Sequence, residues 1–185
     1  MEDFFKILLI VIIVAIVLLI AFAVVTNIAK KNAIKKMYNE VEKILEDVIV
    51  ENQQVKCELE KTFSPQYDYV LKTPNLDYYI KVVPNLSNQE ICVNNSVKWQ
   101  LRKSFNDETM RFVEGIEGLM RMELDNSKAY KKLYIVYPNA RTLLKYINEC
   151  EMVFIHPNTD VYGTNIIPYV AIKENLNLIE IKEEI

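Results

Sequence analysis

The hydrophobic pattern of this chain begins with an unbroken apolar run and then changes to one-sided and alternating patterns. The run from Ile7 to Val25 holds nineteen uncharged apolar residues. At about 1.5 Å per residue a helix of this length measures roughly 28 Å, close to the ~30 Å hydrocarbon thickness of a bilayer. The run therefore predicts a transmembrane helix that anchors the protein in a lipid bilayer.

Two other interpretations of the run fit less well. Residues 21–23 (Ala-Phe-Ala) match the small-x-small cleavage site of a secretory signal peptide. However, the apolar run continues through Val24 and Val25, and two acidic residues precede it. A buried core helix is rarely apolar on every face for five turns. An uncleaved membrane anchor remains the favoured interpretation.

The charges that flank the run predict its orientation. One lysine, Lys6, precedes it, and four membrane-flanking lysines follow it before the first acid at Glu40: Lys30, Lys31, Lys35 and Lys36. Lysine and arginine concentrate on the cytoplasmic side of a span. We therefore expect a short outside tail and a cytoplasmic C-terminal domain. The same lysines can also contact anionic lipid head groups, at about 1 kcal/mol each.

A seven-residue repeat of apolar positions follows the membrane run. It places Ile34, Val41, Val48 and Val55 on one stripe, and no Gly or Pro lies between residues 26 and 60. This predicts an amphipathic juxtamembrane helix over residues 29–60, continuous with the membrane helix. The stripe suits either a short coiled coil that forms a homodimer or packing on the protein's own domain. The charged Glu51 at a d position favours packing.

The remaining pattern predicts an α/β domain over residues 61–185, after the tail and membrane helix (1–28) and the juxtamembrane helix (29–60). The predicted elements, in chain order, are a hairpin (67–72 and 76–83), a strand interrupted at Asn94-Asn95 (90–101), a helix capped by Asn106 (107–124), a strand (133–137), a helix (138–150), a strand (152–155), a loop (156–164) and two strands (166–172 and 176–181). The unit 133–156 has the length of a parallel right-handed crossover. The sequence thus predicts a mixed β-sheet with flanking helices.

Composition narrows the classes of function. The net charge of −3 gives no basic field that favours nucleic acid. Three widely spaced cysteines, Cys57, Cys92 and Cys150, indicate reduced thiols and not a disulfide framework. Three glycines and the absence of a P-loop, G-x-G-x-x-G, C-x-x-C or H-E-x-x-H motif predict no cofactor. The two N-x-S sequons, at Asn85 and Asn94, are interpreted as chance occurrences.

The single histidine is the first residue considered for catalysis. His156 follows a predicted strand, a place where ligands often bind in α/β folds, and Asp160 lies in the same loop. A hydrolase of the Ser-His-Asp type would also need a G-x-S-x-G elbow, which the sequence lacks. His156 is therefore interpreted as an ordinary loop residue.

The predicted order helix, strand, strand, strand, helix, strand, over about residues 33–137, resembles the core of the restriction-endonuclease-like, or PD-(D/E)xK, nucleases. In that family an Asp on the second strand and an acid-x-Lys on the third hold Mg²⁺ and place a lysine near the scissile phosphate. The resemblance puts Asp77 at the first position, as a candidate metal ligand, and Lys98 at the second. Both are the candidate catalytic residues.

One acid of that motif is missing. Ser96 stands two residues before Lys98, and a hydroxyl does not supply the negative charge that a hard divalent cation needs. Glu90 lies too far along the strand to replace it. The resemblance therefore implies an inactive relative without a bound metal. A local basic face with Trp99 as a stacking ring is a second expectation, built from Lys98, Arg102, Lys103, Lys128, Lys131 and Lys132.

Together these patterns predict a single-pass membrane protein whose cytoplasmic α/β domain has a binding, scaffolding or regulatory role and no catalytic activity. Its expected partners are the lipid bilayer and a protein, or a second copy, that binds the juxtamembrane helix. A membrane-tethered metal-dependent nuclease is the first rival. An extracytoplasmic pilin-like assembly subunit is the second, and the four lysines after the span argue against it.

Overall fold

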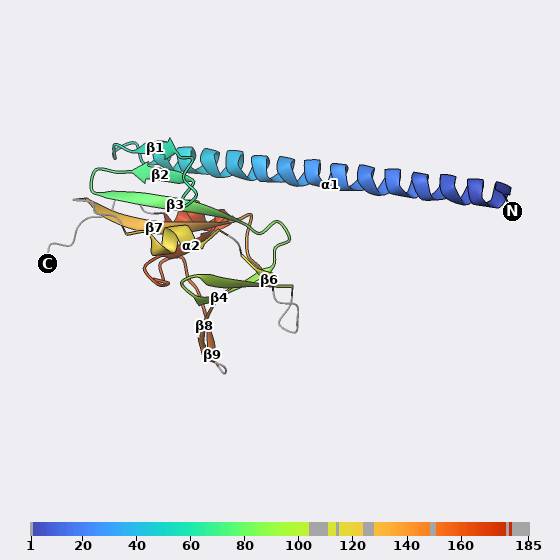
Figure 1. Ribbon diagram of the computed structural model, residues 1–185. Helices are drawn as coiled ribbons and strands as arrows, with labels where there is room; N and C mark the ends of the chain where they lie inside the picture. Colours follow the sequence, from blue (N-terminus) through green and yellow to red (C-terminus); the bar gives the residue numbers. More distant parts are fainter. Residues whose placement is uncertain are drawn as a thin grey trace. The chain divides into compact units, whose positions relative to one another are not determined.

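The computed structural model describes residues 2–103, 111–113, 115–123, 128–148, 151–176 and 178. It confirms the predicted fold class, a long apolar N-terminal helix followed by a mixed α/β domain with two sheets (Figure 1). The chain divides into two compact units, Met1–Lys36 and Met37–Ile185.

Helix α1 (Glu2–Glu51) begins in the first unit and ends in the second. The side chains of residues 4–25 are all exposed, although nearly all of them are apolar. The helix is long and apolar enough to cross a membrane. Ile34 is 40% exposed, so the prediction that it is buried was wrong.

The C-terminal end of α1 comes nine residues earlier than the predicted end at residue 60. The backbone N–H of Asn52 donates to the carbonyl of Val48 (3.2 Å), and its side-chain amide donates to the same carbonyl (2.8 Å). The carbonyl of Val48 thus keeps its helical partner and gains a second donor from the Asn52 side chain where the helix ends. The next element is a strand, β1 (Glu58–Lys61).

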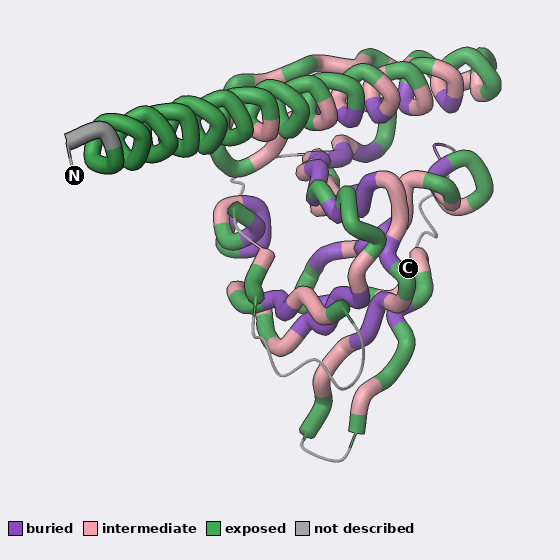
Figure 2. Tube along the Cα trace, turned by 90° about the vertical axis from the view of Figure 1, so that its right-hand side faces the viewer, coloured by how far each residue is buried: buried purple, intermediate pink, exposed green. Residues whose placement is uncertain are grey.

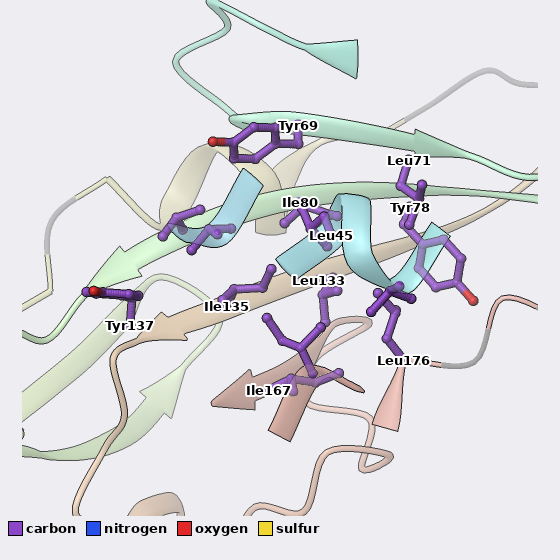
Figure 3. Close-up of a cluster of buried hydrophobic side chains, with 14 of the residues drawn as sticks. Leu45, Tyr69, Leu71, Tyr78, Ile80, Leu133, Ile135, Tyr137, Ile167 and Leu176 are labelled. Carbon is purple, nitrogen blue, oxygen red and sulfur yellow. The ribbon is translucent and has the colours of Figure 1, made fainter. Parts of the chain in front are cut away.

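The domain part of α1 buries one stripe of side chains at Met37, Val41, Leu45 and Val48. Their spacings of four, four and three residues keep them on one face of a helix. They pack in a core cluster with side chains of the first sheet, among them Tyr69, Ile80 and Ile135 (Figure 3). The stripe therefore contacts the protein's own domain, as the packing interpretation predicted.

The first sheet has the strand order β1-β2-β3-β7-β10. It contains β1 and the strands β2 (Tyr69–Lys72), β3 (Leu76–Pro84), β7 (Ala129–Tyr137) and β10 (Asn165–Pro168). β1, β2 and β3 are antiparallel, whereas β3, β7 and β10 run parallel. The predicted hairpin of β2 and β3 is confirmed.

The second sheet has the order β6-β5-β4-β8-β9. Its strands are β4 (Glu90–Asn95), β5 (Lys98–Arg102), β6 (Arg111–Phe112), β8 (Leu143–Asn148) and β9 (Glu151–Phe154). All neighbours are antiparallel except β4 and β8, which are parallel. The strand predicted over 90–101 is divided into β4 and β5, but the turn between them is Ser96-Val97, and Asn94 and Asn95 are the last residues of β4, where the pairing register shifts.

The domain has three layers, with the first sheet in the middle. Successive residues of β7 are buried on opposite faces of the first sheet. Leu133 and Ile135 belong to the core cluster under α1. Tyr134 and Val136 belong to a second core cluster, which includes residues of the second sheet. In that second cluster the ring of Trp99 lies 4.8 Å from the ring of Tyr134. A strand that is buried on both faces needs a continuous apolar run, and residues 133–137 provide one.

Asn85 links the two connections that pass from the first sheet to the second. It is buried, and its side-chain amide donates to the carbonyls of Gln89 (2.8 Å) and Asn139 (2.9 Å). Its Oδ1 accepts the N–H of Gln89 (3.0 Å), and its own N–H donates to Tyr137 (2.7 Å). Because this amide is buried and engaged, the sequon at Asn85 is no exposed acceptor for a glycan.

The helix predicted over 107–124 was wrong in the part that the structure describes. Strand β6 occupies Arg111–Phe112, and α2 covers only Glu117–Arg121. Gly115 has φ +74°, a left-handed conformation that breaks a helix and suits glycine. Residues 107–110, 114 and 124 lie outside the described part of the chain.

The helix predicted over 138–150 was also wrong where the structure describes it, and so was the crossover built on it. Residues 143–148 form β8, which pairs in parallel with β4 and in antiparallel with β9. The spacing of its apolar residues suits a helix locally, but backbone pairing with a neighbouring buried strand decides such ambiguous runs. Cys150 lies outside the described residues.

The end of the chain is also less extended than predicted. Strand β10 stops at Pro168 and is followed by a 3₁₀ turn, η1 (Tyr169–Ala171), and by α3 (Ile172–Asn175). Most of the strand predicted over 176–181 lies outside the described residues. Pro168 supplies the fixed φ with which a helical turn can begin.

The stripe on α1 gives a first prediction. Replacing Val41, which is fully buried, by Asp places a charge in the core and should lower the free energy of unfolding by at least about 3 kcal/mol. Urea unfolding of the full chain in detergent micelles, followed by the fluorescence of its single tryptophan, measures this change.

Val50 provides the matched control, because it is a valine of the same helix and 60% exposed. Val50→Asp should change the unfolding free energy by no more than about 0.5 kcal/mol. Equal unfolding curves for Val41→Asp and the unsubstituted chain would contradict the packing of α1 on the domain.

Candidate functional site

Asp77, the candidate metal ligand, lies on β3 and forms an ion pair. Its Oδ1 accepts a hydrogen bond from the Nζ of Lys128 at 2.6 Å, and its side chain is only 14% exposed. The same ammonium group donates to the carbonyl of Thr73, in the turn between β2 and β3. Asp77 and Lys128 thus connect the β2–β3 turn to the chain just before β7.

Lys98, the other candidate, begins β5 in the second sheet. Its ammonium group lies 4.6 Å from the centre of the Phe112 ring, a cation–π contact with β6. It lines an open cavity of about 470 Å³ that Phe112, Gly115 and Glu117 also line. Asp77 and Lys98 therefore belong to different sheets, and each has a different partner.

Glu90 lies at the opposite end of the β4–β5 hairpin from Lys98, since it pairs with Arg102 across the two strands. Its carboxylate is buried, 3.8 Å from the guanidinium of Arg102, and accepts a hydrogen bond from the hydroxyl of Thr142 (2.9 Å). These contacts connect β4 to β5 and to the start of β8. Glu90 acts here as a structural residue.

The residues of the expected basic face come from both sheets. Lys98 and Arg102 belong to the second sheet, whereas Lys128, Lys131 and Lys132 lie at the start of the first-sheet strand β7. The ammonium group of Lys132 donates to the carbonyl of Met120 (3.0 Å), and burial lowers its pKa. Trp99 is fully buried, so the prediction that it is a stacking ring was wrong.

His156 and Asp160 form turns. The N–H of His156 donates to the hydroxyl of Thr159 (3.3 Å), and Oδ2 of Asp160 accepts the N–H of Gly163 (3.3 Å). Cys57 and Cys92 are free thiols, and burial raises the pKa of both. Within the described ranges, no group of three or more His, Cys, Asp or Glu side chains is placed to hold a metal ion.

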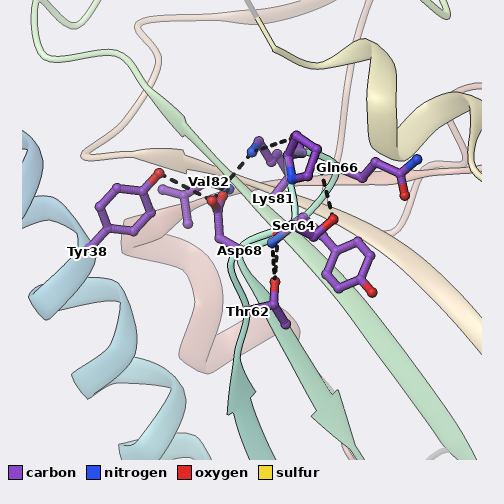
Figure 4. A network of polar contacts seen from close by, with 9 residues as sticks. Tyr38, Thr62, Ser64, Gln66, Asp68, Lys81 and Val82 are labelled. Carbon is purple, nitrogen blue, oxygen red and sulfur yellow. Dashed lines mark hydrogen bonds and ion pairs between the residues drawn. The ribbon is translucent and has the colours of Figure 1, made fainter.

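A network of polar contacts surrounds Asp68, between α1 and the β2–β3 hairpin (Figure 4). Oδ2 of Asp68 accepts the N–H of Val82 (2.8 Å), and Oδ1 accepts the hydroxyl of Tyr38 (3.3 Å) and the ammonium group of Lys81 (3.4 Å). Tyr38 belongs to α1, so one carboxylate connects the helix to β3.

Two further tyrosines connect the sheet to α1. The hydroxyl of Tyr69 donates to the carbonyl of Tyr38 (3.1 Å), and the hydroxyl of Tyr137 donates to the carboxylate of Glu40. Burial, together with the negative charge of Asp68 and its hydrogen bond, raises the pKa of Tyr38 to about 12. Burial followed by the hydrogen bond to Glu40 raises the pKa of Tyr137 to about 12 as well. At neutral pH both phenols keep the proton that they donate.

Two cavities adjoin these elements. One of about 260 Å³ lies beside Tyr38, Asp68 and Tyr69, and Phe63, a fully exposed ring, also lines it. Another of about 470 Å³ lies at the amino ends of β3, β7 and β10. Its floor is apolar (Tyr78, Leu133, Ile167 and Leu176), and its rim is polar (Lys131, Asn158, Asn165, Glu174 and Asn175). The second cavity has the size of a small-molecule site, whereas the first lies below that range.

Sequence reasoning missed the network around Asp68. The available signal was local: an Asp directly before an apolar strand, in a segment rich in Ser, Pro and Gln. Its partners Tyr38 and Lys81 lie 30 and 13 residues away in the sequence. Spacing alone therefore does not indicate that the three side chains meet.

The Asp68 network gives a second prediction. Asp68→Ala leaves the N–H of Val82 without its acceptor and should cost about 1–3 kcal/mol of folding free energy. The measurement is urea unfolding of the full chain in micelles. Asp160→Ala, at an exposed loop carboxylate, is the matched control and should change stability by about 0.5 kcal/mol or less. A cost for Asp68→Ala no greater than that of the control would show that the network contributes no stability.

Comparison with known proteins gives no relative. No family model, no curated protein and no solved structure matches this chain. Its function has to be inferred from its own residues and contacts.

Proposed function

We propose that this is a single-pass membrane protein whose α/β domain lies in the cytoplasm and has a binding, scaffolding or regulatory role at the membrane, without catalysis. The observation that carries the proposal is the difference between the first and the last part of α1. Its first part exposes apolar side chains on every face, and its last part is built into the core of the domain.

The exposure of residues 4–25 supports the anchoring part of this proposal. Single exposed apolar residues are ordinary, but a helix surface that is apolar all round for six turns is costly in water. Lipid hydrocarbon is the environment that removes this cost, and a helix satisfies its own backbone groups there. The four lysines at 30, 31, 35 and 36 support a cytoplasmic position of the domain.

The contacts of the candidate residues support the non-catalytic part of the proposal. Asp77 is engaged by Lys128, Glu90 by Thr142 and Arg102, and Asp68 by three donors. Each of these carboxylates stabilises a connection between elements of the fold. Binding or scaffolding needs only the surfaces and cavities that this fold presents.

The orientation is tested with a reporter fused after Ile185 that is active only outside the membrane. We expect it to be silent in cells, because the lysine cluster holds the domain in the cytoplasm. Replacing the four lysines by Gln is the control and should raise reporter activity several-fold, since only Lys6 then biases the orientation. Strong activity from the unsubstituted fusion would contradict the cytoplasmic position and favour an extracytoplasmic assembly subunit.

The absence of nuclease activity is tested separately. Incubation of the full chain in micelles with single- and double-stranded DNA and RNA and Mn²⁺ should give no cleavage above a protein-free control. The physical reason is the missing acid at Ser96, without which Asp77 alone has to hold the metal. Cleavage that disappears in both Asp77→Ala and Lys98→Ala would support a membrane-tethered nuclease.

A further inference from the structure

Strand β9 is an outer strand of the second sheet and is open on one side. It pairs only with β8 within the described part of the chain. Figures 1 and 2 both show the β8–β9 hairpin extending beyond the rest of the domain. An outer strand of this kind presents unpaired N–H and C=O groups on which another strand can add.

The hydrogen bonds of the hairpin identify which groups are open. The N–H of Ile155 donates to the carbonyl of Leu143 (2.9 Å), so Ile155 points its backbone groups at β8. Backbone groups alternate in direction along a strand. The backbone N–H and C=O groups of Val153, opposite Lys145, are therefore also directed at β8. Those of Met152 and Phe154 are directed away from β8, toward the open side of the strand.

The side chains at this edge are apolar and exposed. Phe154 is 65% exposed, Val153 39% and Ile147 47%. Natural outer strands usually carry Lys, Pro or a bulge that blocks further pairing. An outer strand of the first sheet, β1, carries three charges in four residues, whereas β9 (Glu-Met-Val-Phe) has one, at its start.

We propose that β9 pairs with β9 of a second copy of this chain, in antiparallel register centred on Val153. This extends the second sheet across two molecules. Met152 of each copy then faces Phe154 of the other, and each such pair exchanges two backbone hydrogen bonds. The inference rests on the proposed membrane anchor for the strength of the contact, whereas the geometry of the contact does not depend on the anchor.

The register that satisfies the open backbone groups is also the one that suits the side chains. A two-fold axis through Val153 makes it a non-hydrogen-bonded pair with its own copy, where side chains approach most closely. The exposed ring of Phe154 comes to lie on the same face as Met152 of the other copy, whose Sδ is 3.9 Å from Sγ of Cys92 on β4. Glu151 faces the apolar Ile155, so the register places no like charges opposite each other.

The area of the contact indicates where such a pair would form. Four residues from each copy bury far less than the ~1,200 Å² of a stable soluble complex. Anchoring both copies in one bilayer raises their effective concentration, which can strengthen a weak contact by orders of magnitude. We therefore expect the pair to form mainly on vesicles, and in micelles only at high protein concentration.

Cysteine cross-linking tests the register. In a non-hydrogen-bonded antiparallel pair the Cα atoms lie about 4.5 Å apart, within the range that a disulfide spans. The full chain with Val153→Cys, reconstituted in phosphatidylcholine vesicles and oxidised, should give at least ten times more disulfide dimer than Val170→Cys. Val170 is the matched control, because it is a valine, 63% exposed, in η1. The unsubstituted chain, which has three cysteines, sets the baseline.

A second variant tests the strand edge without a disulfide. Phe154→Lys places a charge on the exposed edge and should reduce energy transfer between differently labelled copies on vesicles at least five-fold, whereas Val170→Lys should leave it unchanged. Equal cross-linking of Val153→Cys and Val170→Cys, or energy transfer unaffected by Phe154→Lys, would overturn the proposal. If Phe154→Lys leaves the energy transfer unaffected, the open edge of β9 would be a site for a segment of another protein and not for a second copy.

A separate measurement distinguishes failure of the proposed membrane anchor from failure of the proposed β9 pair. Flotation of the vesicles shows whether the chain is bound to the bilayer. If it does not float, the membrane proposal fails, and cross-linking of Val153→Cys in concentrated micelles still measures the β9 pair. If it floats and no excess dimer forms, the pair proposal fails while the anchor stands.

Discussion

The burial of the α1 stripe on the first sheet is the contact on which the rest of the domain depends. Met37, Val41, Leu45 and Val48 supply one side of a core whose other side is the sheet itself. Without this helix, the face of the sheet under it would expose side chains such as Tyr69, Ile80 and Ile135 to water. Three polar contacts, from Tyr38 to Asp68, Tyr69 to Tyr38 and Tyr137 to Glu40, hold the helix in register on that face.

The middle position of the first sheet explains the roles of many polar residues. Because β7 is covered on both faces, the connections to the second sheet have to turn within a buried region, and Asn85 satisfies their backbone groups. The carboxylates of Asp68, Asp77 and Glu90 lie at the places where separate elements meet. A buried carboxylate is stable only when it is paired and hydrogen-bonded, so these residues have structural partners.

Two of the outer strands, β1 and β9, differ in charge. β1 is charged, and its lysine pairs with Glu42 of α1 (2.5 Å). β9 is apolar and belongs to a hairpin that extends beyond the rest of the domain. The proposed contact between two β9 strands is small, so it would associate weakly in solution and more strongly when copies share a bilayer.

The sequence by itself determined the elements whose signal is local. The apolar run, the continuous helix after it, the β2–β3 hairpin and the buried strand at residues 133–137 could be predicted, because length, periodicity and turn residues are enough to specify them. Of the candidate site, it predicted that Ser96 breaks the acid-x-Lys motif, but not that Asp77 and Lys98 lie on different sheets with separate partners. The tertiary structure alone decided that residues 143–148 form a strand, that the buried stripe of α1 includes Leu45 and not Ile34, and that Asp68 accepts hydrogen bonds from α1 and from β3. In each case the deciding partner, such as β4 for β8 or Tyr38 for Asp68, lies 30 or more residues away, and pairing with it outweighs the local preference of the segment.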